Sequence, residues 1–186
     1  MLNVKLSFIS VNKHLVAILL FCCLGNLQAQ DTTLQSIGGL LDSYFLAAET
    51  MDSTMRFEAF QLLFTESGTV NSVVMNSDGS NRVKQGNWKS YIEKSGSYYN
   101  RFTPNFVEDS REMEYYLEIA SVHCIVTQYS AQKTSGKKFK ERYWMQFDLI
   151  YLTNRWYIDN VLWVNEIQGI PIENALLTDT LLYSPN

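Results

Sequence analysis

His123 is the residue in this chain best suited to acid–base chemistry. The sequence holds two histidines, and the other, His14, lies in an N-terminal segment that we expect to be removed. An imidazole titrates near neutral pH, so His123 could act as a general base or hydrogen-bond a ligand. An acid–base enzyme is therefore one hypothesis for this chain.

Metal binding and nucleophilic catalysis have less support from the residue types. His123 and Cys124 are adjacent, and adjacent side chains of a strand point to opposite faces, so the two cannot share a metal ion. A cysteine nucleophile needs exposure and a neighbouring base, whereas Cys124 is typical of a small buried apolar residue. Gly38 and Gly39 lie within a helical pattern and not in a phosphate-binding loop. We expect no metal site and no cofactor.

His123 can lie on either face of its predicted strand. If it shares a face with Tyr115, Leu117, Ile119 and Ser121 and that face lines a pocket, it becomes a ligand contact. The face formed by Val122, Cys124 and Val126 is equally apolar and could be the inner one instead. The pattern alone leaves both arrangements open.

Residues 142–163 form the element that must position such a site. Alternating apolar and polar residues, many aromatic or β-branched, predict an antiparallel hairpin. Thr153 and Asn154 would be its two-residue connection; a three-residue loop would swap the faces of one strand. Counting outward from the turn gives an apolar inner face without any acid. With Tyr44 and His123 added, the predicted pocket is Tyr44, His123, Tyr143, Met145, Phe147, Trp156, Ile158 and Asn160.

The outer face of this hairpin is too polar for a core and too aromatic for an ordinary solvated surface. In this register Trp144 lies opposite Trp163, and Asp148 lies opposite Asp159. Aromatic residues with few lysines are typical of interface cores, so we expect a homodimer through this face. Its predicted residues are Trp144, Ile150, Tyr157, Val161 and Trp163. The alternative is cover by the C-terminal tail through Ile167, Ile170, Ile172, Leu176 and Leu177.

Helical patterns come before the strands in this chain. Apolar residues at helical spacing predict a helix over residues 34–48, Asp52 or Ser53 can cap a second, and Asn87 a third short one. Strands are expected over 69–75, 104–108 and 114–129, with a turn at 76–79 and a loop at 132–138. Helices first and a meander last predict an α+β fold, a strongly curved antiparallel or mixed sheet wrapped around about three helices as a cone with an internal pocket.

The N-terminal 29 residues are expected to be a signal peptide, leaving residues 30–186 as one domain. Lys5 and Lys13 precede a short apolar run, residues 15–24, and Ala29 follows. Neither Cys22 nor Cys23 follows a small residue, which disfavours a lipoprotein, and a retained anchor is disfavoured by length. We expect a periplasmic or secreted bacterial protein without a membrane span or disulfide. The net charge of −4 becomes more negative without the two lysines and argues against nucleic acid and anionic membranes.

The chain resembles the nuclear transport factor 2-like superfamily, which includes ketosteroid isomerase, scytalone dehydratase and polyketide cyclases. The resemblance rests on the order of several short motifs: residues 60–64 (FQLLF), 106–108 (FVE), 155–158 (RWYI), 161–163 (VLW), and Glu166 with Ile170-Pro171. It is greatest to small bacterial members without an established activity. Superfamily members often pair through the sheet, so the resemblance also implies a homodimer.

Two functions follow for a member of this fold, which hosts enzymes and binding domains alike. One is an exported domain that binds a small apolar ligand or a partner. The other is an isomerase, dehydratase or cyclase that uses His123 with tyrosines. Ketosteroid isomerase-like members use a carboxylate base, yet Asp42 falls off the apolar stripe of its helix and should face water. The binding domain is therefore the leading hypothesis.

Overall fold

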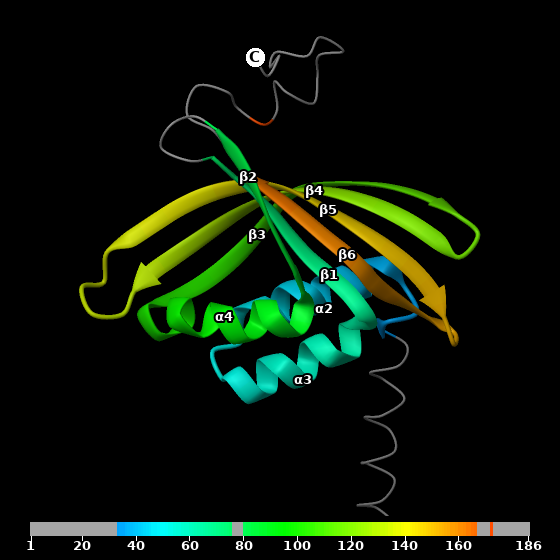
Figure 1. Ribbon diagram of the computed structural model, residues 1–186, viewed down its shortest axis with the longest axis horizontal. Helices are drawn as coiled ribbons and strands as arrows, with labels where there is room; N and C mark the ends of the chain where they lie inside the picture. The colour runs from blue at the N-terminus through cyan, green and yellow to red at the C-terminus, as the bar shows by residue number, and fades with distance from the viewer. Residues whose placement is uncertain (1–32, 76–79, 167–171, 173–186) are drawn as a thin grey trace, which may run out of the picture.

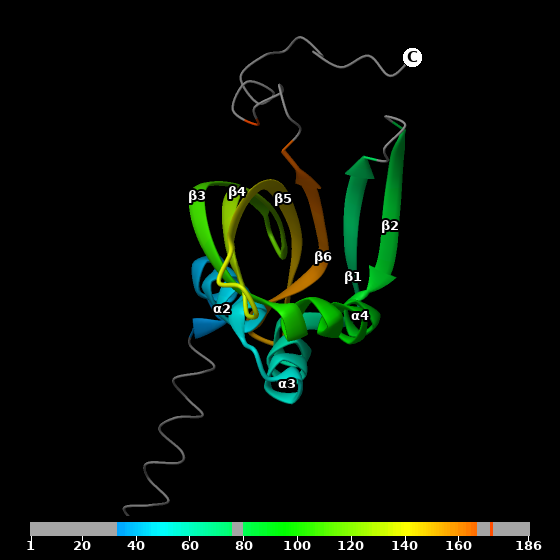
Figure 2. The ribbon, with the colours of Figure 1, turned by 90° about the vertical axis from the view of Figure 1, so that its left-hand side faces the viewer.

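The computed structural model describes residues 33–75, 80–166 and 172. Three helices gather against one side of a curved sheet (Figures 1 and 2). The sheet has six strands in the order β2-β1-β6-β5-β4-β3, in which β1 and β6 are parallel and the other neighbours are antiparallel. The predicted α+β cone is confirmed. The predicted signal peptide, the turn at 76–79 and the tail residues Ile167, Ile170, Leu176 and Leu177 lie outside the described residues.

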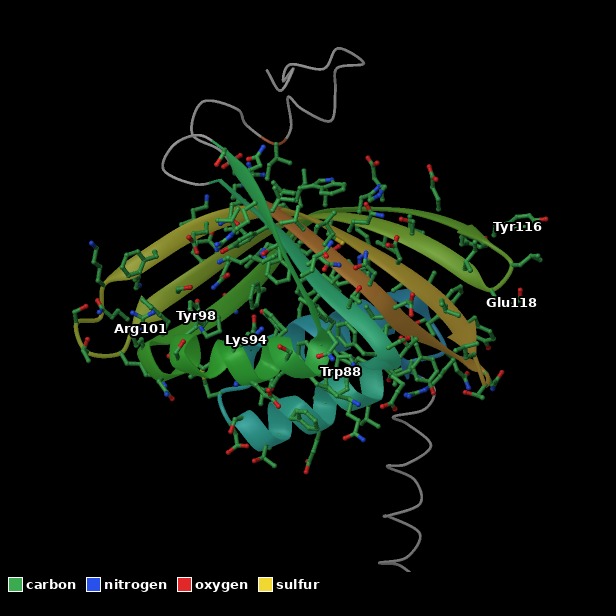
Figure 3. All side chains as sticks on the ribbon, in the orientation of Figure 1. Trp88, Lys94, Tyr98, Arg101, Tyr116 and Glu118 are labelled. Carbon is green, nitrogen blue, oxygen red and sulfur yellow. The ribbon has the colours of Figure 1, made fainter. Side chains whose placement is uncertain are left out.

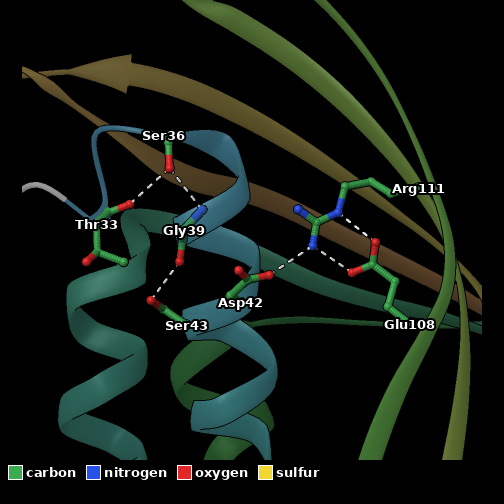
Figure 4. Close-up of polar contacts among 7 residues, drawn as sticks. All are labelled: Thr33, Ser36, Gly39, Asp42, Ser43, Glu108 and Arg111. Atoms are coloured by element: carbon green, nitrogen blue, oxygen red, sulfur yellow. Dashed lines mark hydrogen bonds and ion pairs between the residues drawn. The ribbon is translucent and has the colours of Figure 1, made fainter.

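The helices are α2 (Ile37–Glu49), α3 (Ser53–Leu63) and α4 (Trp88–Arg101). Side chains of Ser36, Asp52 and Asn87 accept hydrogen bonds from the first turns of these helices, satisfying amides that have no intrahelical partner. Figure 4 shows the cap at Ser36, whose Oγ lies 3.0 Å from the amide nitrogen of Gly39. The caps at Asp52 and Asn87 were predicted, but α4 is longer than the short helix expected there.

The strands are β1 (Phe64–Met75), β2 (Asn81–Asn87), β3 (Phe102–Tyr116), β4 (Ile119–Gln132), β5 (Lys138–Leu152) and β6 (Arg155–Asn165). The prediction of a single strand over 114–129 is wrong. Leu117 has a φ of 54° and lies in a turn, so the chain reverses there and β3 pairs with β4 from Tyr116 and Ile119 onward. The sequence is mostly apolar on both sides of this turn, so the hydrophobic pattern did not indicate it.

The β5–β6 turn is the one predicted. Thr153 and Asn154 have φ values of 47° and 68°, and Leu152 pairs with Arg155. Positive φ at both central residues is the geometry that matches the twist of a two-residue hairpin. The strands stay in the predicted register as far as the pair Leu149 and Ile158.

Beyond that pair a bulge changes the register. Asp148 pairs with Asn160, so Asp159 is the extra residue, and every later side chain of β6 moves to the other face. The neighbouring strand β1 is irregular at the same level, between Phe64 and Thr69. A Cβ on Gly68 would lie 2.8 Å from the Phe64 ring and 3.2 Å from the Ile158 carbonyl oxygen, so glycine allows this close approach.

The core lies between the helices and one face of the sheet, here called the inner face. Val122, Cys124, Val126, Phe147 and Ile158 are almost fully buried there. The opposite face of the sheet is called the outer face. Burial of the aromatic and aliphatic side chains supplies most of the stability of a domain without disulfides in its described part.

An ion-paired cluster ties α2 to β3. The Arg111 guanidinium lies 2.6 Å from Glu108 and 3.2 Å from the Asp42 carboxylate (Figure 4). The Asp42 side chain is 75% exposed, as predicted. Burial, reinforced by the Glu108 carboxylate, raises the pKa of the Cys124 thiol to about 12, which fits a buried apolar role and not a nucleophile.

Candidate functional site

A cavity of about 840 Å³ lies between α4, the inner face of the sheet and α2. Its volume falls within the range of small-molecule sites. Apolar side chains from five elements form much of its lining: Phe45, Ala48, Val70, Val74, Phe106, Met145 and Trp163. Trp163 packs edge-on against Tyr91 of α4, with ring centroids 5.5 Å apart, so the last strand and the helix meet at the cavity.

Five tyrosines surround the same cavity: Tyr44, Tyr91, Tyr98, Tyr99 and Tyr143. Burial raises the pKa of Tyr91 to about 12, and burial is also the main cause of the raised pKa of the other four. All five phenols are therefore neutral and able to donate hydrogen bonds at physiological pH.

Three of these hydroxyls are bound within the protein. Tyr99 donates to the Ala48 carbonyl at 2.6 Å, and Tyr143 donates to the Glu141 carboxylate at 2.8 Å. Tyr98 hydrogen-bonds the Ser130 hydroxyl at 2.6 Å and accepts from the Gln128 side-chain amide. Tyr98 lies on α4 between Lys94 and Arg101 (Figure 3).

The other two hydroxyls are available to a ligand. Within the described part of the chain, neither the Tyr44 nor the Tyr91 hydroxyl has a hydrogen-bond partner. The rings themselves are fixed: Tyr44 packs against Phe60 and Phe147, and Tyr91 against Trp163. Fixed donors in an apolar cavity are the usual means by which a binding site orients a ligand.

Arg56 supports the cavity wall from behind. It is 1% exposed, its guanidinium lies 3.6 Å from the centre of the Tyr99 ring, and its Nη1 donates to the Thr50 carbonyl at 2.7 Å. No carboxylate pairs with Arg56 among the residues that the structure describes. It therefore connects the α2–α3 junction to α4 through carbonyl and ring contacts.

Of the eight predicted pocket residues, three line this cavity. These are Tyr44, Tyr143 and Met145. Phe147, Ile158 and Trp156 lie on the same inner face but pack into the core outside the cavity lining.

His123 lies on the outer face, and its predicted place in the pocket is wrong. Its neighbours Val122 and Cys124 are buried in the core, so alternation sends His123 outward, where its ring stacks on Trp144 at 5.3 Å. This removes the candidate base from the cavity.

Asn160 is also on the outer face, because the bulge at Asp159 reverses its direction. There it joins three strands: its amide donates to Asp148 at 2.8 Å, and its carbonyl accepts from Thr69 and Asn71. Asp159 does not face Asp148 as predicted but accepts a hydrogen bond from Thr65 at 2.8 Å. The role of Asn160 is thus to hold the sheet together.

The predicted dimer face is divided by the same bulge. Trp144, Ile150 and Tyr157 lie on the outer face, whereas Val161 is fully buried in the core and Trp163 lines the cavity. Trp144 pairs with Val164 and not with Trp163.

Several cavity residues were not predicted from the sequence. Glu141, on the inner face beside Tyr143, lies one position before the segment 142–163 whose inner face was predicted to hold no acid. Lys94, Ser95 and Tyr98 follow Tyr91 at helical spacing on α4, a pattern visible in the sequence.

Metal clusters and membrane-spanning helices are both absent from the described parts of the chain. Residues 33–75, 80–166 and 172 contain no group of three or more histidine, cysteine or acidic side chains placed to hold a metal ion. Among these same residues, no helix has the length and apolar character needed to cross a membrane.

Comparisons with known proteins give matches in structure alone. No protein-family model matches the sequence, and no curated protein matches it. A nuclear transport factor 2-like superfamily protein from Salmonella enterica aligns with a TM-score of 0.57 at 14% identity, over 74% of this chain and 94% of its own. An uncharacterized protein with a cystatin-like fold from Caulobacter vibrioides aligns with a TM-score of 0.53 at 12% identity, over 76% of this chain and 94% of its own.

A third solved structure, named as a candidate aromatic ring hydroxylase from Novosphingobium aromaticivorans, aligns with a TM-score of 0.53 at 15% identity, over 70% of this chain and 87% of its own. At such identities the likeness concerns the backbone and carries no activity over. Together with the three helices and the curved mixed sheet, it shows that the chain has the nuclear transport factor 2-like fold.

Proposed function

We propose that this protein is an exported domain that binds a small, mostly apolar molecule in the cavity between α4, α2 and the sheet. The observation that carries the proposal is the cavity of about 840 Å³, which is lined by aromatic rings and by the hydroxyls of Tyr44 and Tyr91, two phenols without a hydrogen-bond partner among the described residues. A mostly apolar cavity with a few fixed donors suits binding and orientation of a ligand. An enzyme that uses His123 has no support, because that imidazole stacks on Trp144 outside the cavity.

The neutral fluorescent probe N-phenyl-1-naphthylamine tests the binding site. We expect it to bind at micromolar concentrations with a rise in fluorescence, because its fused and single rings match an aromatic cavity of this size. Ser95→Trp, which places an indole in the cavity, should weaken binding by at least about tenfold through lost volume. Fluorescence titration measures both values.

Ser97→Trp is the matched control, since Ser97 is exposed on the same helix and outside the cavity lining. It should bind the probe as the parent does. A parent that does not bind the probe, or equal loss in the two tryptophan variants, would contradict a ligand site in this cavity.

We also propose that the protein forms a homodimer through the outer face around Trp144. Supporting this is the aromatic and aliphatic character of the face, where the Trp144 indole stacks on His123 and Trp144 pairs across the sheet with Ile125 and Val164. The alternative is that the chain's own C-terminal tail covers this face. Ile172 of that tail is 7% exposed, and its amide donates a hydrogen bond to Glu166.

Trp144→Glu is expected to convert the dimer into a folded monomer in sedimentation velocity. A carboxylate placed against the same face of a second chain would be buried without a partner, which costs several kcal/mol. Met55→Glu, at an exposed apolar position of α3, should leave the sedimentation unchanged. A parent that is monomeric at tens of micromolar would exclude even a dimer of micromolar affinity.

A further inference from the structure

The charged residues around the cavity are mostly cations. Arg82, Lys84 and Lys94 line it, against Glu141 as the one acid in the lining that the structure describes. All three cationic side chains are exposed, so they stand where the cavity meets solvent. This local excess of positive charge contrasts with the net charge of −4 of the chain.

The two cations of β2 face the cavity and not away from it. Arg82 pairs with Val74 and Lys84 with Ser72, and these partners line the cavity. Lysine and arginine on an edge strand commonly prevent pairing with other chains. Inward-pointing charges can serve that role as well, but Arg82 and Lys84 also stand at the cavity itself, where they can meet an anionic group of a ligand.

None of the three cations is neutralised within the described part of the protein. No ion pair joins Arg82, Lys84 or Lys94 to an acid there. The one nearby carboxylate, Glu141, already accepts the hydrogen bond of Tyr143. The positive charge of these three cations, at the opening where the cavity meets solvent (the mouth), is therefore available to a ligand.

The interior has a different character. Beneath the charged mouth the lining is aromatic and aliphatic, and its phenols are neutral donors. A molecule complementary to both regions has an apolar body and an anionic end.

We infer that the ligand of this cavity is an amphipathic anion, whose apolar body lies among the rings of α2, α4 and β6 and whose carboxylate, sulfonate or phosphate meets Arg82, Lys84 and Lys94. This inference rests on the proposed function and narrows it to a chemical class. It also gives β2 a function, as the strand that carries two of the three recognition charges.

A pair of probes with one body tests the charge alone. 1-Anilinonaphthalene-8-sulfonate is N-phenyl-1-naphthylamine with a sulfonate added, so their ratio of dissociation constants reports the anionic group. At low salt we expect the sulfonate to bind about five times more tightly, because three cations act at short range in a partly solvated site. The triple variant R82Q/K84Q/K94Q should bind both probes about equally, and about 0.5 M salt should reduce the parent's preference.

The matched control removes three cations elsewhere. K133Q/K137Q/K138Q makes the same change in net charge on the β4–β5 connection and the first residue of β5, outside the cavity lining, and should keep the preference for the sulfonate. Loss of the preference in this control would mean that net charge and not the mouth is responsible, and would overturn the inference.

The outcomes separate the two proposals. If both probes bind equally well to the parent, or the neutral probe binds better, the anionic class is wrong while the ligand site stands. If neither probe binds, or Ser95→Trp does not weaken them, the ligand site itself is wrong and the inference falls with it.

Discussion

Replacing Arg56 with alanine is expected to lower the free energy of unfolding by about 3 kcal/mol, the scale found when a buried hydrogen-bonded side chain is truncated. The change deletes the bond from Nη1 to the Thr50 carbonyl and leaves that oxygen without its partner. It also removes the guanidinium from the Tyr99 ring and leaves a cavity at a site that is 1% exposed. Urea unfolding followed by far-ultraviolet circular dichroism measures the loss.

Arg155 provides the matched control, because its guanidinium also lies over a tyrosine ring, Tyr157, at 4.1 Å, but in a partly exposed place. Arg155→Ala should cost no more than about 1 kcal/mol, the value of such contacts in solvent. Arg56→Lys keeps the charge and one donor without the planar stack, so its loss should fall between the two. A cost for Arg56→Ala as small as that for Arg155→Ala would mean that the helices are held by apolar packing alone.

The result also bears on the cavity. Tyr99 lines it and donates to the Ala48 carbonyl of α2. Arg56 holds the other side of the Tyr99 ring, so its removal should loosen the wall shared by α2 and α4. Weaker binding of N-phenyl-1-naphthylamine in the folded fraction of Arg56→Ala is the expected consequence.

The sequence was sufficient to predict features that depend on short segments. Thr153-Asn154 forms the expected turn because both residues accept positive φ, and Asp52 and Asn87 cap helices because their side chains reach the next turn's amides. Ile158 lies inward because it comes before the bulge, whereas Phe147 and Met145 lie inward because the extra residue is in β6 and β5 keeps its alternation.

The candidate site could not be predicted in the same way, because distant contacts decide it. The bulge at Asp159 is matched by the irregularity of β1 near Gly68, some ninety positions earlier in the printed chain. Both local patterns look regular, so a count along β6 alone sends Asn160 inward and Trp163 outward, the reverse of what occurs. The face of His123 depended on pairing with β3 and β5, which the alternation of β4 by itself left open.

Raising the pH from about 9 to about 12 is expected to remove several kcal/mol of stability. The folded protein holds Tyr91 at a pKa of about 12, and Tyr44, Tyr98, Tyr99 and Tyr143 also have raised pKa values because burial disfavours the phenolate. In the unfolded chain tyrosine ionises near a pH of about 10. The stabilisation is therefore complete below about pH 10 and is lost as the pH rises toward the folded-state pKa values. For each buried phenol, the free energy of unfolding falls by about 1.4 kcal/mol for every unit by which its folded-state pKa exceeds its unfolded-state pKa.

Urea midpoints at four pH values between about 9 and about 12, with phenolate absorbance in the near ultraviolet, test this linkage. Tyr44→Phe isolates one contribution: its hydroxyl has no partner among the described residues, so the change should be small near neutral pH, while the loss of stability in the alkaline range should shrink. Tyr116→Phe, at a side chain that is 72% exposed, should leave the whole profile unchanged. If the folded protein instead releases all its phenolic protons at the pH of an unfolded chain with no loss of stability, the tyrosines around the cavity are hydrated, and the site is not the apolar cavity on which ligand binding depends.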